Sequence, residues 1–342
     1  MTIEELARSE GIWNSSTKDD SDIVLKSSIK FFRNIEGYAF AHKLIKRDRD
    51  RVCKNILEKI ENNDYLFDFS TYKLNRITPF DKRILVERNI IQDNKSYSGT
   101  LLLSHDQHYY FVLGEKDHIE YVIIKSGFYL NDIYGYGKKV ILNIENKIGF
   151  AFSEKFGYLT AHPENSGPGI EMVMTLHLPG LIFSSRINEV VFELEKKGIG
   201  VRSSWVDGYY EVFNKYSRGL IEKDIYENTF AGFQRIIKYE RESREKEYNS
   251  NRVLIEDKVW RSYGILLSSR LISLYEALDL LSYLRLGISL GIISYLTIKD
   301  INLLLFYIQD FHLKKRYNID DEDHNMEKVR AQFLIEYLKE VM

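Results

Sequence analysis

The chain has 342 residues, of which 44% are hydrophobic and 29% are charged, and its formal net charge is −2. This length suits two packed domains, and the composition is typical of a soluble globular protein, not of a disordered or fibrous one. The small net charge excludes roles that rest on bulk electrostatic attraction, so we expect neither nucleic acid nor a membrane surface as a partner.

Cysteine usage and apolar runs bear on the location of the protein. The single cysteine, Cys53, rules out an internal disulfide framework and fits a reducing compartment. We interpret it as a packing thiol and not as a nucleophile. The apolar stretch Leu278–Ile298 is interrupted by Asp279 and Arg285, which leaves a run too short to span a bilayer. Since the N-terminus also lacks a signal-peptide core, we expect a cytoplasmic protein.

The first part of the chain predicts a strand followed by two helices. Residues 1–20 are polar, and we expect them to be frayed, with Trp13 as the one anchor. Ile23–Asn34 interleaves apolar and polar residues, as strands do. Residues 41–61 have apolar positions near helical spacing, and residues 81–91 read as a second helix.

Short apolar runs separated by turn residues then predict an antiparallel sheet. The four predicted strands are Gly99–His105, Tyr109–Leu113, Ile119–Lys125 and Lys139–Ile144. His105 and His108 lack a third ligand at a suitable spacing, so we interpret them as polar residues beside a hairpin and expect no metal site.

The remainder of the chain is predicted to be mainly helical. Residues 176–197 and 226–247 read as helices, the second with many Glu–Arg and Glu–Lys pairs on a solvated face. After a predicted bend at Tyr248–Asn251, Leu- and Ile-rich helical patterns indicate a smaller all-helical domain over residues 251–342. The acidic run Asp320–Asp323 is interpreted as a solvated loop.

One loop, Phe156–Gly169, is unusually dense in backbone-fixing residues. It holds two of the four prolines of the chain, with Asn, Ser and Gly between them. Such loops are more often functional than decorative. The alternative is an ordinary connection between elements, which also needs Gly and Pro.

This loop resembles the signature loop of the ATP:guanido phosphotransferase family, which includes creatine, arginine and bacterial protein-arginine kinases. The family pattern is matched at Gly157, Tyr158, Leu159, Thr160, Pro163, Asn165, Gly167 and Gly169. His162 stands where the family has its catalytic Cys, and Pro168 replaces the middle residue of Gly-Thr-Gly. The resemblance implies an α+β fold: a glutamine-synthetase-like antiparallel sheet flanked by helices over residues 1–250, and then the helical domain.

The resemblance also implies a reaction, in which ATP with Mg²⁺ donates its γ-phosphoryl group to a guanidinium. Such catalysis is mostly positioning and electrostatics. In the family, arginines hold the nucleotide phosphates, whereas carboxylates and a thiolate hold the acceptor. At two phosphate-binding positions of the first strand this chain has Ser28 and Lys30, while Arg33 and Asn34 match.

Further family positions fall in later segments. In Gly114–Glu120, Glu115, Asp117 and His118 match, but Lys116 replaces an acceptor-binding Glu and Glu120 replaces a phosphate-binding Arg.

Four more family positions lie beyond the signature loop. Glu171 stands where protein-arginine kinases carry another phosphate-binding Arg, whereas the phosphate-loop arginine is kept as Arg202. The C-terminal half resembles the helical domain of those enzymes alone. Of their phosphoarginine-docking motif, Arg330 and Ala331 remain.

Several matching residues have structural readings as well. Arg33 and Arg202 fit structural ion pairs as readily as ligands, and Glu115 could cap a hairpin. His118 and His177 lie among apolar residues, which favours core histidines over catalysts.

The substitutions predict a pseudokinase. A charge-assisted hydrogen bond contributes about 1.5–3 kcal/mol and micromolar nucleotide affinity is about 8 kcal/mol, so losing three phosphate contacts removes most of the binding energy. We expect a regulatory or scaffolding homodimer in protein quality control. Its partners would be protein clients, an active paralogue, a kinase activator or a Clp-type protease system. The alternatives are an active ATP-dependent protein-arginine kinase with an atypical site, and a phosphoarginine reader acting through Arg330.

Overall fold

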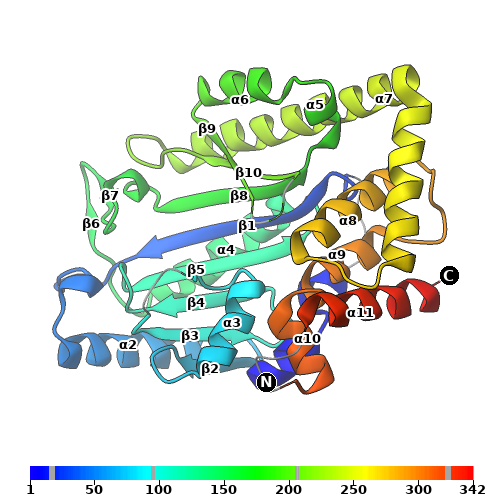
Figure 1. Ribbon diagram of the computed structural model, residues 1–342. Helices are drawn as coiled ribbons and strands as arrows, with labels where there is room; N and C mark the ends of the chain where they lie inside the picture. The colour runs from blue at the N-terminus through cyan, green and yellow to red at the C-terminus, as the bar shows by residue number, and fades with distance from the viewer. Residues whose placement is uncertain (15–19, 94–96, 205, 207, 320–324, 342) are drawn as a thin grey trace.

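The computed structural model describes residues 1–14, 20–93, 97–204, 206, 208–319 and 325–341. In this part of the chain, one eight-stranded antiparallel sheet carries helices on both faces (Figure 1). This confirms the predicted α+β fold. The side chain of Trp13 and the acidic run Asp320–Asp323 lie outside the described residues.

The sheet is built around a strand that is buried on both faces. This strand, β1 (Val24–Arg33), pairs antiparallel with β5 on one side and with β8 on the other. The strand order is β2-β3-β4-β5-β1-β8-β10-β9. The other strands are β2 (Phe69–Lys73), β3 (Thr100–Ser104), β4 (Tyr109–Leu113), β5 (Ile119–Ser126), β8 (Ile170–His177), β9 (Ile199–Ser203) and β10 (Tyr209–Asn214). A small separate ribbon joins β6 (Phe152–Ser153) to β7 (Gly157–Tyr158).

Four helices cover one face of the sheet. They are α2 (Lys46–Glu61), α4 (Leu130–Glu145), α6 (Ile187–Glu195) and the first part of α7 (Glu222–Ser268). Their buried side chains form one core with Ile29, Phe31 and Tyr121 of the central strands. Short helical turns η2 (Ala41–Lys43) and η3 (Pro163–Asn165) lie in the connecting loops.

The opposite face carries the ends of the chain. It packs against α1 (Ile3–Arg8), η1 (Gly11–Asn14), α3 (Pro79–Glu87), α8 (Leu274–Ser289), α9 (Ile298–Tyr307), α10 (Asp310–Tyr317) and α11 (Met326–Glu340). Figure 1 shows these C-terminal helices beside the strands, near the N-terminus. Helix α7 contains a non-helical residue, Asn251 (φ −130°, ψ 33°), at the predicted bend.

Three predictions about elements were wrong. The apolar run 139–144 belongs to α4, because Ile133, Gly137, Val140 and Ile144 recur at helical spacing and are buried. The predicted helix 176–197 is the end of β8, then α5 (Pro179–Phe183) and α6. The first residues are not frayed: α1 has a capping box between Thr2 and Glu5, and its Leu6 is fully buried.

Helix length also bears on membrane insertion. None of the helices in the described part of the chain combines the length and apolar character that crossing a bilayer requires.

Candidate active-site cleft

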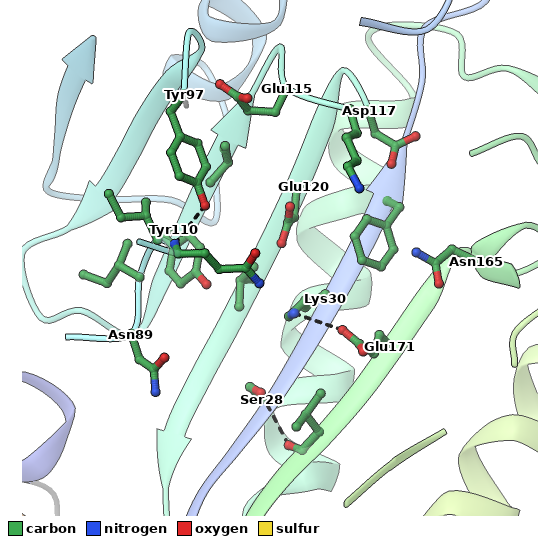
Figure 2. Close-up of a pocket in the computed structure, with 18 of the residues that line it drawn as sticks. Ser28, Lys30, Asn89, Tyr97, Tyr110, Glu115, Asp117, Glu120, Asn165 and Glu171 are labelled. Atoms are coloured by element: carbon green, nitrogen blue, oxygen red, sulfur yellow. Dashed lines mark hydrogen bonds and ion pairs between the residues drawn. The ribbon is translucent and has the colours of Figure 1, made fainter. Parts of the chain in front are cut away.

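A cleft of about 870 Å³ opens on the sheet face that carries Lys30 (Figure 2). Strands β1, β5, β8 and β9, the turn between β4 and β5, and the Phe156–Gly169 loop contribute to its walls. It brings together most of the predicted site residues: Ser28, Lys30, Glu115, Lys116, Glu120, His162, Glu171 and Arg202. Arg33 and Arg330 are not among the lining residues.

Strand alternation decides which residues of β1 face the cleft. Successive side chains point to opposite faces, so Lys26, Ser28 and Lys30 line the cleft. Arg33 falls on the other face and is buried. Its guanidinium donates to the carbonyls of Pro168 and Gly169, both at 3.1 Å. Its Cζ lies 3.7 Å from the centre of the Tyr158 ring. The prediction of Arg33 as a nucleotide ligand is therefore corrected: it holds the signature loop.

The floor of the cleft contains a partly buried ion pair. Lys30 and Glu171 lie directly opposite each other on β1 and β8, and their charged atoms are 2.9 Å apart. Glu120 is opposite Phe32 on β5, one diagonal step from Lys30. Figure 2 shows Lys30 between the two carboxylates.

These carboxylates change the acid–base behaviour of the floor. Burial lowers the pKa of Lys30, but Glu171 and Glu120 outweigh it and leave that pKa above its ordinary value. Burial raises the pKa of Glu171, and the Lys30 ammonium more than reverses this, so the pKa of Glu171 is lowered. Both groups are therefore charged at neutral pH and neutralise each other.

A second cross-strand ion pair occupies the wall. Arg202 on β9 is opposite Glu211 on β10, and its Nε and Nη2 atoms lie 2.8 and 2.7 Å from Glu211 Oε2. The guanidinium also stacks on Phe213, with Cζ 4.4 Å from the ring centre. Arg202 is thus in the cleft, as predicted, and is bonded to a carboxylate there.

An ammonium group lies at the rim of the cleft, near the signature loop. Lys116 Nζ donates to His162 Nε2 at 2.6 Å, and His162 Nδ1 is 3.5 Å from a carboxylate oxygen of Glu164. The imidazole at the position of the family's catalytic Cys therefore accepts a hydrogen bond from an ammonium.

Several residues that match the family pattern hold the loops. Asp117 Oδ1 accepts from Asn34 Nδ2 at 2.6 Å and from the Ala161 amide at 2.7 Å, which ties the signature loop to β1. Glu115 Oε1 accepts from the amides of Ser98 and Gly99 at 2.8 and 2.6 Å. Glu115 therefore pins the start of β3, although it also lines the cleft.

Charges in the cleft cancel. Among the described lining residues, five are Lys or Arg and five are Asp or Glu. The cations are Lys26, Lys30, Arg49, Lys116 and Arg202, and the anions are Glu115, Asp117, Glu120, Glu171 and Glu211.

Sequence reasoning missed three groups of the cleft. Lys26 is buried beside the floor, and burial lowers its pKa, with Lys30 acting in the same direction and Glu211 against it. Tyr110 faces Lys30, and burial raises its pKa. Alternation along the strands was the one available signal for Lys26, but nothing in the sequence paired Glu211 with Arg202.

Arg330 does not form an exposed docking site. It is 2% exposed, and it donates to the carbonyls of Ile308 and Ile272, both at 2.9 Å, and to Asp310. The prediction of a phosphoarginine reader acting through Arg330 is corrected, because each of the three guanidinium nitrogens already donates a hydrogen bond within the helical domain.

The remaining chemical candidates are buried core residues. Burial lowers the pKa of His118 to about 4, and its Nδ1 accepts from the Ile35 amide at 2.9 Å. His177 is fully buried and contacts Ser282 and Arg244. Within the described ranges, no group of three or more His, Cys, Asp or Glu side chains is arranged to hold a metal ion.

Both halves of the chain match families of known proteins. The profile of the ATP:guanido phosphotransferase C-terminal catalytic domain matches residues 51–243, and that of the protein-arginine kinase McsB C-terminal domain matches residues 252–342. Protein-arginine kinases of Bacillus cereus strain AH187 and of Bacillus anthracis are each 34% identical over 292 residues. These alignments cover 82% of this chain and 82% of each relative.

Solved structures show the same fold at lower identity. The duplicated taurocyamine kinase from Schistosoma mansoni superposes with a TM-score of 0.61 and 20% identity over 73% of this chain, which corresponds to 39% of that protein. Lombricine kinase superposes with a TM-score of 0.57 and 16% identity over 68% of this chain and 70% of its own. With 34% identity to protein-arginine kinases over most of its length and profile matches in both halves, this chain belongs to the protein-arginine kinase branch of the ATP-dependent guanido phosphotransferases.

Proposed function

We propose that this family member is a pseudokinase: its cleft does not hold ATP for transfer, and it acts as a regulatory or scaffolding protein in protein quality control. One observation carries the proposal: the cleft in which the family binds phosphates contains two ion pairs within the chain, Lys30–Glu171 and Arg202–Glu211.

A polyphosphate needs uncompensated positive charge. Two of the cations it would contact are already bonded to carboxylates, and a third carboxylate, Glu120, faces the same floor. Entry of the nucleotide would therefore require two charge-assisted pairs to break and would bring carboxylates against phosphates. The partly buried Lys30–Glu171 pair contributes about 1.5–3 kcal/mol, and the more exposed Arg202–Glu211 pair contributes about 1 kcal/mol or less. Breaking both pairs therefore opposes binding.

The acceptor side of the cleft is changed in the same sense. A guanidinium is held by carboxylates, but the rim offers Lys116 hydrogen-bonded to His162. An ammonium at this place repels an incoming arginine side chain. Glu115, the neighbouring carboxylate that matches the family pattern, has one oxygen occupied by two backbone amides.

The scaffold around the cleft supports a binding role. Arg33, Asn34 and Asp117 still hold the signature loop against the sheet, so the outer shape of the catalytic domain is kept while its charges are rearranged. Such a molecule can occupy the place of an active relative in an assembly. We propose an active kinase paralogue, a kinase activator or a Clp-type protease system as partners, with self-association as a homodimer in the cytoplasm.

The test is phosphoryl transfer to protein. The purified chain is incubated with ATP, Mg²⁺ and an arginine-rich protein, and acid-labile phosphoarginine is measured by mass spectrometry. A Bacillus protein-arginine kinase serves as the positive control. The proposal predicts no phosphoarginine above that of a sample without enzyme, and it is overturned by transfer from the folded chain at a rate near that of the control.

One observation favours a second candidate, an active kinase with an atypical site that uses ATP and Mg²⁺. The cleft keeps a volume of about 870 Å³ and still presents Lys30, Arg202 and Glu115. This candidate predicts arginine phosphorylation that is lost in Arg202→Ala. Activity that survives this substitution would exclude Arg202 as a phosphate ligand.

A further inference from the structure

A second, smaller pocket lies behind the cleft, between helix α2 and the edge of the sheet formed by β2 and β3. Its volume is about 360 Å³. Its described lining includes five basic side chains, Lys46, Arg49, Lys54, Lys73 and Arg76, and one acidic side chain, Asp50. We call this the α2 pocket. Positive charge is thus concentrated here, whereas the charges of the cleft cancel.

The cations of the α2 pocket are largely uncompensated. Among the described residues, no carboxylate lies within ion-pair distance of Lys46, Arg49, Lys73 or Arg76. Lys54 is the exception, since Glu58 lies one turn away on α2 at 4.0 Å. On the long helix α7, by contrast, exposed cations such as Lys223 and Lys238 have a carboxylate one turn away.

Hydrogen-bond donors at the α2 pocket are arranged for a small anion. Lys73 Nζ donates to Thr100 Oγ1 at 2.8 Å, which fixes the ammonium at the pocket and leaves two of its protons for another acceptor. Arg49 and Arg76 add planar guanidinium groups, which bind tetrahedral oxyanions through two parallel hydrogen bonds. Cys53 and Leu57 supply the apolar side of the pocket.

The α2 pocket adjoins the cleft. Arg49 and Ser98 line both cavities, and Ser98 is one of the two residues whose amides Glu115 fixes. A group bound in the α2 pocket would therefore touch the segment that positions a wall of the cleft.

We propose that the α2 pocket is a binding site for a phosphoryl group, carried by a phosphorylated protein side chain or present as free phosphate. The concave shape and the basic lining of the pocket suit a phosphoryl group, and the volume leaves room for the side chain that carries it. A nucleic acid would require an extended basic stripe, and the chain as a whole has a net charge of −2.

The experiment is a calorimetric titration of the full chain at low ionic strength. The ligands are inorganic phosphate, a phosphoserine peptide and the same peptide without phosphate. The test variant is Lys73→Glu/Arg76→Glu, in which both side chains are exposed. The matched control is Lys223→Glu/Lys238→Glu, which makes the same charge change on exposed residues of α7. A third variant, Lys116→Ala, alters the rim of the cleft. Circular dichroism and thermal melts verify folding.

The expected results separate the two sources of the phosphoryl group. Inorganic phosphate, the phosphopeptide or both should bind the wild-type protein. K73E/R76E should weaken that binding at least about tenfold, which corresponds to about 1.4 kcal/mol. The control and Lys116→Ala should stay within about twofold. Binding of both ligands with similar affinity indicates free phosphate, and a phosphopeptide that binds at least about tenfold tighter indicates a protein ligand.

Three outcomes would overturn the proposal. The first is no binding of phosphate or phosphopeptide by folded wild-type protein. The second is equal weakening in the control variant, which would indicate bulk charge alone. The third is binding that depends on Lys116 and not on Lys73 and Arg76.

Discussion

At the scale of single residues, most departures from the family pattern lie on the floor and at the rim of the cleft, whereas the residues that hold the scaffold match the pattern. Lys30 and Glu171 are bonded to each other, and Lys116 is bonded to His162. Arg33 and Asp117, which match, fix the signature loop from outside the cleft floor. The residues of the floor and the rim are thus paired with one another.

The Lys30–Glu171 pair should be measurable as stability. Glu171→Gln keeps the shape but leaves the partly buried Lys30 ammonium without this partner, so we expect a loss of about 2 kcal/mol at pH 7 in urea unfolding. Glu189→Gln, which removes an exposed pair with Arg186, is the control and should cost less than about 0.5 kcal/mol.

The same pair predicts a pH dependence. Since the folded-state pKa of Glu171 lies below its ordinary value of 4.5, its contribution is complete above that value and is lost as the pH falls through the folded-state pKa. The stability difference between wild type and Glu171→Gln should therefore shrink below pH 4.5. A difference that is constant from pH 7 to acid would contradict the ion pair.

Cys53 gives an independent test at this scale. Burial raises the pKa of its thiol to about 11, outweighing the nearby Lys73 and Arg49. The thiolate fraction is then small at pH 8, and we expect alkylation by iodoacetamide at least about a hundredfold slower than in the unfolded chain. Rapid modification of the native protein at pH 8 would argue against a packing thiol.

The site could be predicted from the sequence only in part. A motif gives the identity of a position, so eight cleft residues were found from their place in the family pattern. It does not give strand register, and register is what joins Lys30 to Glu171 and Arg202 to Glu211. For the same reason Arg33 was misplaced, because the side to which a strand residue points depends on the sheet in which it lies.

At the scale of elements, the signature loop depends on glycine at a crowded turn. Gly167 has φ +103°, and a Cβ there would lie 2.8 Å from the Ser217 carbonyl oxygen, whereas Gly219, with φ +79°, has open space. Both positions are in the left-handed region, but only the first is also blocked by backbone.

This contrast predicts two different costs. Gly219→Ala should lose about 1 kcal/mol from the backbone conformation alone. Gly167→Ala should lose at least about 2 kcal/mol, because the loop must also move away from Ser217. Equal losses in thermal or urea unfolding would contradict the packing described here.

Elements were predictable where the pattern was long and were missed where it was short. Strands β3, β4 and β5 alternate with clear turn residues and were found, and α2 has a full helical period. The apolar run 139–144 was too short for its pattern to distinguish a strand from the buried side of a helix, and it belongs to α4. In 176–197, Pro179 and Gly180 start a short helix α5, and Ser185 (φ +56°) ends it before α6.

At the scale of the whole molecule, the C-terminal helices share a core with the catalytic domain. Leu281, Leu304 and Phe333 cluster with Leu101 and Val122 of the sheet. Arg285 is fully buried and donates to the carbonyls of Ser21 and Asp22, at 2.7 and 3.1 Å, which joins α8 to the segment before β1.

Shared burial of this kind predicts cooperative unfolding. Calorimetry should show one thermal transition for the full chain, and Arg285→Met should lower the midpoint of that transition by removing about 3 kcal/mol. Two separate transitions, with only the C-terminal one moved by the substitution, would indicate that the helical part folds independently of the sheet.

The central claim is that carboxylates have taken over the charges that a nucleotide would need, and titration of MgATP into the full chain tests it most directly. We expect no saturable heat at millimolar nucleotide, as for a dissociation constant weaker than about 1 mM, while a Bacillus protein-arginine kinase titrated in parallel binds. Saturable binding with a micromolar dissociation constant, abolished by Arg202→Ala, would contradict the account.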